Sequence, residues 1–123
     1  MNASRTILLV EDDSDVRRMI GEHLEFYEYR VVEARDGMEG LQRLESGQYD
    51  LVITDIVMPF VSGVGVVRAV KAKRPEIPVI AITGQGKVSE DMAAESNADL
   101  VLDKPINMAE FVEHVRRLLG EHP

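Results

Sequence analysis

The sequence predicts an α/β domain in which a parallel sheet of five strands carries helices on both faces. Short apolar runs alternate with longer stretches whose apolar residues recur at helical spacing, a pattern typical of parallel strands joined by right-handed crossovers. The apolar runs are nearly continuous, as in strands buried on both faces. Several end abruptly on acidic, hydroxyl or basic residues, which predicts a polar site at the carboxyl edge of the sheet.

Five segments are expected to form the strands, at about residues 6–10, 30–34, 51–55, 79–82 and 99–102. The second is less apolar than the first, and polar residues are best tolerated on an edge strand, so we place it at an edge. The first and third are expected inside the sheet. Pro75 and Pro78 mark the turn into the fourth strand, because proline fits neither a helix interior nor a central strand.

Helices are expected between these strands. Asp13 or Ser14 can cap the first helix, and Arg17 and Arg18 are expected on its solvent side. Its buried face is predicted from helical spacing to comprise Val16, Met19, Ile20, Leu24 and Tyr27. The other helices are expected at about residues 38–46, 63–73, 89–96 and 108–119.

Turn residues separate the predicted elements. Gly47 suits a left-handed position after the second helix, and Asn97 suits one after the fourth. The segment from Thr83 to Gly86 is expected to be a flexible loop because it holds two glycines. The helix that follows this loop has the weakest amphipathic pattern in the chain.

The composition indicates a single domain spanning residues 1–123, with the strand and helix alternation at about 6–119. A net charge of −8 and a pI near 4.8 argue against a nucleic-acid surface and favour a cation or a basic partner. The chain has no cysteine, which excludes disulfides and thiolate metal sites. It shows no signal peptide and no membrane-spanning apolar run, so a soluble cytoplasmic protein is expected, without a direct contact to membranes.

Three acidic residues, Glu11, Asp12 and Asp55, are expected to converge at the carboxyl ends of the first and third strands. Carboxylates in one place repel one another unless a cation lies among them or one is protonated. Mg²⁺ fits best, because it binds a few carboxylates and retains several waters. The alternative for Glu11, Asp12 and Asp13 is structural, since acids in the first turn of a helix stabilise it through the helix dipole. For Asp55 the alternative is a structural, turn-forming role.

Thr83 and Lys104 close the fourth and fifth strands at the same edge. Each alone is compatible with a loop hydroxyl or a surface lysine. Together with Asp55, however, they form the set that a phosphoryl group on a carboxylate would require. Asp55 would be the nucleophile, the cation would neutralise phosphoryl oxygens, and Lys104 and Thr83 would contact the others.

The sequence resembles the receiver domains of bacterial two-component response regulators over nearly its whole length. Four motifs carry the resemblance: Leu9-Val10-Glu11-Asp12-Asp13, Ile53-Thr54-Asp55-Ile56-Val57-Met58-Pro59 followed by Gly63, Ile82-Thr83-Gly84, and Asn97 through Lys104-Pro105. The resemblance implies a flavodoxin-like doubly wound sheet of strand order 2-1-3-4-5. It also implies a phosphorylation-dependent signalling switch rather than an enzyme acting on other substrates.

By matching position, the resemblance assigns Asp55 as the phosphoacceptor. Asp12 would be a direct Mg²⁺ ligand, Glu11 would act mostly through water, and the backbone carbonyl of Val57 would complete the protein ligands. Thr83 would be the switch hydroxyl. Lys104 would be the ion-pairing lysine, followed by a cis bond to Pro105.

The implied partners are a sensor histidine kinase or a histidine phosphotransfer protein as phosphodonor, and a downstream protein or effector domain. The resemblance is also compatible with a dimer that forms on phosphorylation. The chain could be a stand-alone receiver, which we favour, or the first part of a longer regulator. The receiver would catalyse only two reactions, the phosphotransfer to its own aspartate and its own dephosphorylation.

Two positions depart from the family pattern. Val101 stands where the family often has an aromatic residue, and Asn97 stands where it usually has glycine.

Three other functions remain open. An aspartyl-phosphate phosphatase could use the Asp13-Ser14-Asp15 segment as its nucleophile motif. A receiver-like module that never takes phosphate would not need the full polar set, and a flavodoxin would need a hydroxyl-rich loop after the first strand.

Overall fold

The computed structural model describes residues 4–59, 61–84 and 87–121. Its sheet has five parallel strands in the order β2-β1-β3-β4-β5, as predicted. The strands are β1 (Thr6–Val10), β2 (Arg30–Ala34), β3 (Leu51–Asp55), β4 (Val79–Thr83) and β5 (Leu100–Asp103). The expected interior positions of the first and third strands and the edge position of the second are confirmed.

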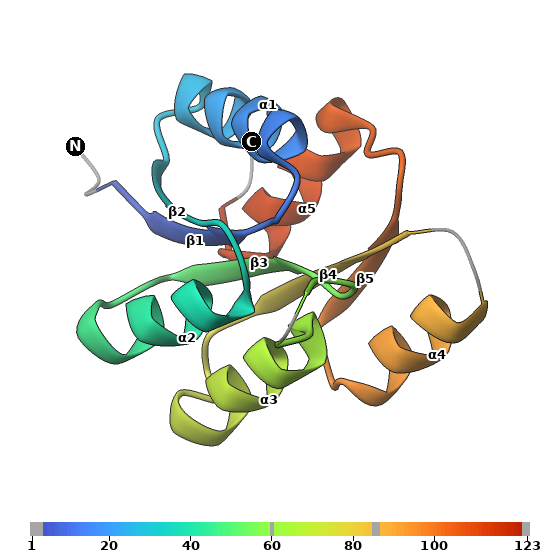
Figure 1. The fold of residues 1–123 in the computed structure, drawn as a ribbon. Helices are drawn as coiled ribbons and strands as arrows, with labels where there is room; N and C mark the ends of the chain where they lie inside the picture. Colours follow the sequence, from blue (N-terminus) through green and yellow to red (C-terminus); the bar gives the residue numbers. More distant parts are fainter. Residues whose placement is uncertain (1–3, 60, 85–86, 122–123) are drawn as a thin grey trace.

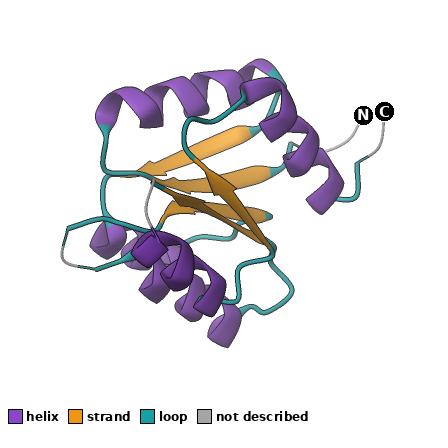
Figure 2. Ribbon diagram, turned by 90° about the vertical axis from the view of Figure 1, so that its right-hand side faces the viewer, coloured by secondary structure: helices purple, strands orange, loops and turns teal. Residues whose placement is uncertain are grey.

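Five helices connect and follow the strands: α1 (Ser14–Phe26), α2 (Gly37–Ser46), α3 (Gly63–Lys73), α4 (Lys87–Glu95) and α5 (Met108–Leu118). Helices α1 and α5 cover one face of the sheet, and α2, α3 and α4 cover the other (Figure 1). Figure 2 shows the resulting three layers, with the strands between two groups of helices. Of the predicted loop after β4, Gln85 and Gly86 lie outside the described residues.

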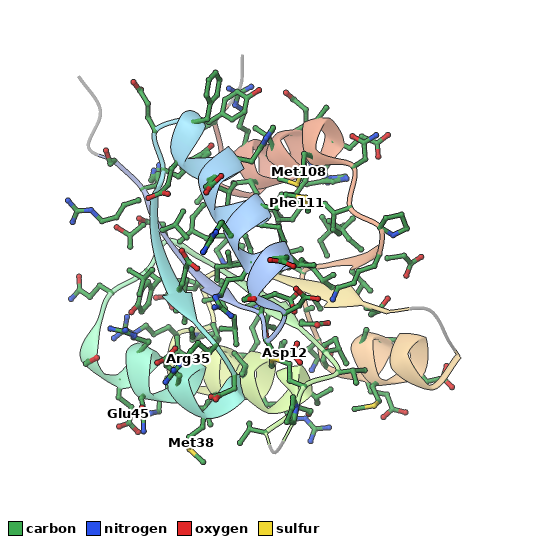
Figure 3. The ribbon with its side chains drawn as sticks, turned by 45° about the horizontal axis from the view of Figure 1, so that its top comes forward. Asp12, Arg35, Met38, Glu45, Met108 and Phe111 are labelled. Carbon is green, nitrogen blue, oxygen red and sulfur yellow. The ribbon has the colours of Figure 1, made fainter. Side chains whose placement is uncertain are left out.

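Two large apolar clusters and a smaller one of Ile56, Ala81 and Ala93 lie between the sheet and its helices. On the α1 and α5 face, Ile20, Leu24 and Phe111 pack on alternate residues of the strands, and Phe111 extends from α5 toward α1 in Figure 3. On the opposite face, Val66 and Val70 of α3 belong to the second cluster. Because both faces are covered, the inner strands β1, β3 and β4 are buried along most of their length, which explains their largely apolar sequence.

Two residues that were predicted on the buried face of α1 do not lie there. Met19 and Tyr27 are exposed rather than buried, because the sheet-facing stripe of α1 follows the spacing of Val16, Ile20 and Leu24. The Tyr27 ring lies outside the core, where the guanidinium of Arg116 stands 4.9 Å from its centroid.

The turn residues give a mixed result. Gly47 is not left-handed, since its backbone is extended at φ −128° and ψ 172°. Asn97 has the expected positive φ of 69°, and the Lys104-Pro105 bond is cis. Asp13 is the N-cap of α1, and its carboxylate accepts hydrogen bonds from the backbone N–H of Asp15 and Val16.

The parallel register brings the ends of four strands to one edge. Asp55 at the end of β3 is level with Ile82, and Thr83 at the end of β4 is level with Asp103. The loop after β1 reaches the same edge, where Figure 3 labels Asp12 between β1 and α1. Among the helices of the described segments, none is long and apolar enough to span a membrane.

Candidate functional site

The predicted acidic residues come together at this edge. One carboxylate oxygen from each of Glu11, Asp12 and Asp55 lies within 4.8 Å of the other two. Glu11 and Asp55 are 1% and 4% exposed, whereas Asp12 is exposed. Two buried carboxylates and one accessible carboxylate therefore face a common space that opens to solvent.

Lys104 places its ammonium group between the two buried acids. Its Nζ donates a hydrogen bond of 3.0 Å to Oδ2 of Asp55 and lies 3.2 Å from Oε1 of Glu11. Burial alone lowers the pKa of Lys104, but the hydrogen bond and charge of Asp55 and the charge of Glu11 outweigh it, so the pKa lies above its usual value. Lys104 is therefore held in its charged form.

Glu11 is the least solvated of the three acids. Burial, assisted by the charge of Asp55, raises its pKa from 4.5 to about 7, against the opposing effects of a backbone hydrogen bond and Lys104. Its Oε2 accepts that bond, 3.1 Å long, from the N–H of Asp13. Its Oε1 accepts no hydrogen bond from any residue that the structure describes, despite the nearby Lys104.

The donor set fits a hard divalent cation. Three carboxylates supply oxygen ligands, and the buried Oε1 of Glu11, although 3.2 Å from the Lys104 ammonium, has no hydrogen-bond donor among the described residues. Such a set suits Mg²⁺, which prefers oxygen and retains part of its water shell. The side chain of Val57 is exposed in the loop after β3, and the role of its carbonyl stays a prediction.

Arg17 is a contributor that the sequence pattern missed. Its Nη1 donates a 2.9 Å hydrogen bond to the backbone carbonyl of Glu11, and its Nε lies 3.1 Å from Oε1 of Glu33 on β2. The helical pattern put Arg17 on the solvent side of α1, yet its side chain bends back and is mostly buried. It ties the acidic loop to the first turn of α1 and to the edge strand.

Gly63 fixes the backbone behind Asp55. Its N–H donates a 2.9 Å hydrogen bond to the carbonyl of Ile56, and a Cβ at this position would collide with the Asp55 carbonyl and with the backbone of Ile56. The start of α3 therefore packs directly on Asp55, which ends β3, and on Ile56, which follows it. Only glycine allows this approach without a shift of the loop.

Thr83 is fully buried at the end of β4, and its hydroxyl is already engaged. Its Oγ1 donates a 2.8 Å hydrogen bond to Oδ1 of Asp103, while its backbone carbonyl accepts a 2.8 Å bond from the N–H of Lys104. Asp103 was not among the predicted site residues. An acidic residue next to a lysine is common on protein surfaces, so the sequence does not indicate that Asp103 contacts Thr83.

A hollow of about 620 Å³ opens beside Lys104 and leads outward between α1 and the loop after β5. Its lining comprises Val16, Met19, Gly84, Lys104, Pro105 and Ile106. Among the described residues, a Cβ at Gly84 would meet no atom within 4 Å. The site is thus accessible to a reacting group carried by another molecule.

The family model of the response regulator receiver domain matches residues 7–116. This chain therefore belongs to the receiver domain family of response regulators. Phosphorylation-dependent signalling in two-component systems is the general role of that family.

Individual relatives agree with this membership. The response regulator MprA of Mycobacterium ulcerans is 34% identical over 114 residues, covering 92% of this chain and 49% of the relative. The chain thus spans about half the length of the curated relatives it matches. All three acids, Thr83 and Lys104 lie inside the matched family segment.

Solved structures include receivers with the fold of this chain. The receiver domain of the Pseudomonas aeruginosa sensor histidine kinase PA1611, which has magnesium coordinated in its active site cleft, is 27% identical with a TM-score of 0.89, covering 97% of this chain and 100% of that one. Thermotoga maritima TrrA, in complex with Mg²⁺ and BeF, is 33% identical with a TM-score of 0.84, covering 93% and 98%.

Proposed function

We propose that this receiver is a phosphorylation-dependent switch and that Asp55 accepts the phosphoryl group. The observation that carries the proposal is the position of the Asp55 carboxylate, which is nearly buried, contacts the Lys104 ammonium at 3.0 Å and faces two further acids. A lone buried carboxylate is costly. Here its environment suits a group that gains negative charge when it reacts.

In the proposed step, a carboxylate oxygen of Asp55 attacks the phosphorus of a phosphohistidine. The new P–O bond forms as the P–N bond breaks, and the imidazole leaves with the electron pair and takes up a proton from solvent. Lys104 would follow the developing charge on one phosphoryl oxygen, because its ammonium already contacts Asp55. The Thr83 hydroxyl would donate a hydrogen bond to another.

We further propose that Glu11, Asp12, Asp55 and the backbone carbonyl of Val57 hold Mg²⁺ in the acidic cluster. When bound, the ion would neutralise charge on the phosphoryl oxygens. The buried Oε1 of Glu11, which has no hydrogen-bond donor among the described residues, supports this assignment, as does the magnesium in the PA1611 and TrrA receivers. Asp13 is the N-cap of α1, and its carboxylate already accepts two backbone hydrogen bonds. This argues against the rival phosphatase, which would use the Asp13-Ser14-Asp15 segment as its nucleophile motif.

Partners follow from the same chemistry. A sensor histidine kinase or histidine phosphotransfer protein would supply the phosphoryl group, and a downstream protein or effector domain would bind the phosphorylated form. Residues 1–123 would act as one receiver unit, located in the cytoplasm with such a kinase. Autodephosphorylation would return it to the resting state.

Intact-mass analysis with a small-molecule phosphodonor and Mg²⁺ tests the proposal. The wild type should gain the mass of one phosphoryl group, Asp55→Asn should gain none, and Asp13→Asn should be labelled like the wild type. Asp15→Asn is a further control, since it removes an exposed acid from the same helix start. Equal labelling of wild type and Asp55→Asn would refute the assignment, and loss of label in Asp13→Asn alone would favour the phosphatase.

A further inference from the structure

The hydroxyl of Thr83 has one proton to donate, and in this structure the carboxylate of Asp103 accepts it. The two residues are level with each other on neighbouring parallel strands, so their side chains lie on the same face of the sheet. The Oγ1 to Oδ1 distance is 2.8 Å. Thr83 is 0% exposed, whereas Asp103 is exposed, so the Asp103 carboxylate provides the acceptor at the solvent side of a buried hydroxyl.

We propose that Asp103 holds the switch hydroxyl in the resting state and competes with the phosphoryl group for its proton. This inference rests on the proposed function of Asp55 and Thr83. A hydroxyl has a single O–H donor, so Thr83 cannot donate to Asp103 and to a phosphoryl oxygen at the same time. Engagement of the phosphoryl group therefore breaks the bond to Asp103.

The competing bond is stronger than a neutral one. Hydrogen bonds to an ionised acceptor are roughly twice as strong as those between neutral groups, so the carboxylate favours the resting orientation more than an amide would. The free Asp103 carboxylate would return to water, since it is exposed. The competition therefore concerns the hydroxyl proton and not the burial of a charge.

Val101, two positions before Asp103 on β5, makes the bond between Thr83 and Asp103 more important. Val101 lies on the same face as Asp103 and level with Ala81, and it is partly exposed. Valine is short and stiff at χ1, so it gives Thr83 no bulky neighbour that could hold its side chain in one orientation. Asp103 is then the positioning residue that defines where the hydroxyl lies before phosphorylation.

Beryllofluoride, which mimics a phosphoryl group on a carboxylate, provides the test. The full chain would be titrated with it at saturating Mg²⁺, and the apparent affinity measured for the wild type, Asp103→Val and Asp103→Asn. Asp103→Val removes the acceptor and should tighten binding about two- to tenfold. Asp103→Asn keeps an acceptor oxygen and should gain less. Glu110→Gln removes an exposed charge from α5 and should bind like the wild type.

A double-mutant cycle separates the hydrogen bond from the charge of Asp103. In a Thr83→Val background the hydroxyl is gone, so Asp103→Val should no longer tighten binding. Wild-type affinity in Asp103→Val, or the same gain in the Thr83→Val background, would overturn the role of Asp103 while leaving the proposed function intact. Absence of beryllofluoride binding by the wild type would overturn the proposed function, and this inference with it.

Discussion

The ammonium of Lys104 lies 3.0 Å from Oδ2 of Asp55. Asp55 ends β3 and Lys104 follows β5, so β4 lies between their strands in the sheet. Both residues end or follow a strand, and the parallel arrangement places those ends together. The same ammonium stands 3.2 Å from Glu11. One cation therefore offsets the repulsion between two buried acids.

Replacement of Lys104 by methionine should destabilise the chain, because two nearly buried carboxylates lose their cation. The side chain of Lys104 is 30% exposed, which reduces the expected loss of unfolding free energy to about 1–2 kcal/mol at pH 8 without divalent cations. Urea denaturation would measure it. Lys73→Met, which breaks an exposed pair with Glu45, should change stability by less than about 0.5 kcal/mol. An equal loss in both variants would contradict this account.

The raised pKa of Glu11 predicts how stability depends on pH. Its folded-state pKa of about 7 lies above its ordinary 4.5, so between these values the folded protein retains a proton that the unfolded chain has lost. The stabilisation from this group is complete below about pH 4.5 and is lost as the pH rises through about 7.

Glu11→Gln, which is neutral at every pH, should therefore gain stability relative to the wild type between pH 5 and pH 8, by more than about 1 kcal/mol. Chemical denaturation at both pH values, without divalent cations, would measure the difference. Glu76→Gln changes an exposed acid and should not alter the pH dependence. A constant difference between Glu11→Gln and wild type across this range would show that Glu11 titrates normally.

Arg17→Ala should cost about 1–2 kcal/mol of unfolding free energy, because a charged donor to the Glu11 carbonyl is lost together with the contact to Glu33. Its neighbour Arg18 is exposed, and Arg18→Ala should stay within about 0.5 kcal/mol of wild type. Amide exchange of residues 12–14 should also accelerate in Arg17→Ala only. Unchanged exchange there would mean that Arg17 does not hold the acidic loop.

Gly63→Ala should destabilise by about 1–3 kcal/mol or more, since its Cβ would meet the backbone of Asp55 and Ile56, which cannot rotate away. Gly65 offers a matched control two residues later in α3. Among the described residues, a Cβ at Gly65 would meet only Cγ1 of Val61, at 3.3 Å. The free energy of unfolding of Gly65→Ala should therefore lie within about 1 kcal/mol of wild type, because alanine has the better helix propensity. Thermal unfolding of both variants would measure the difference. Equal tolerance at both positions would contradict the tight packing behind Asp55.

Much of the fold follows from the sequence by simple physics. Alternating apolar runs and amphipathic stretches require parallel strands with helices on both faces, and this brings residues that end strands, such as Asp55 and Lys104, to one edge. The strand order came from the family resemblance rather than from the alternation. Periodicity was less reliable at the margins of α1, where Met19 lies just outside the buried stripe.

The contacts of individual side chains could not be predicted in the same way. Arg17 has a long side chain whose reach toward the Glu11 carbonyl depends on the path of the acidic loop. The bond between Thr83 and Asp103 depends on the register of β4 and β5, and a shift of one residue would turn Asp103 to the other face. Sequence spacing determines neither of these.

Chemical trapping of the phosphorylated residue tests the central claim most directly. Borohydride reduces an acyl phosphate on aspartate to homoserine, so the wild type treated with phosphodonor and Mg²⁺, then reduced and digested, would carry the modification at the acceptor. Fragment masses should place it at Asp55 and at no other acid, and Asp55→Asn should remain unmodified. Homoserine at Asp12 or Asp13 instead, or at Asp103, would contradict the account.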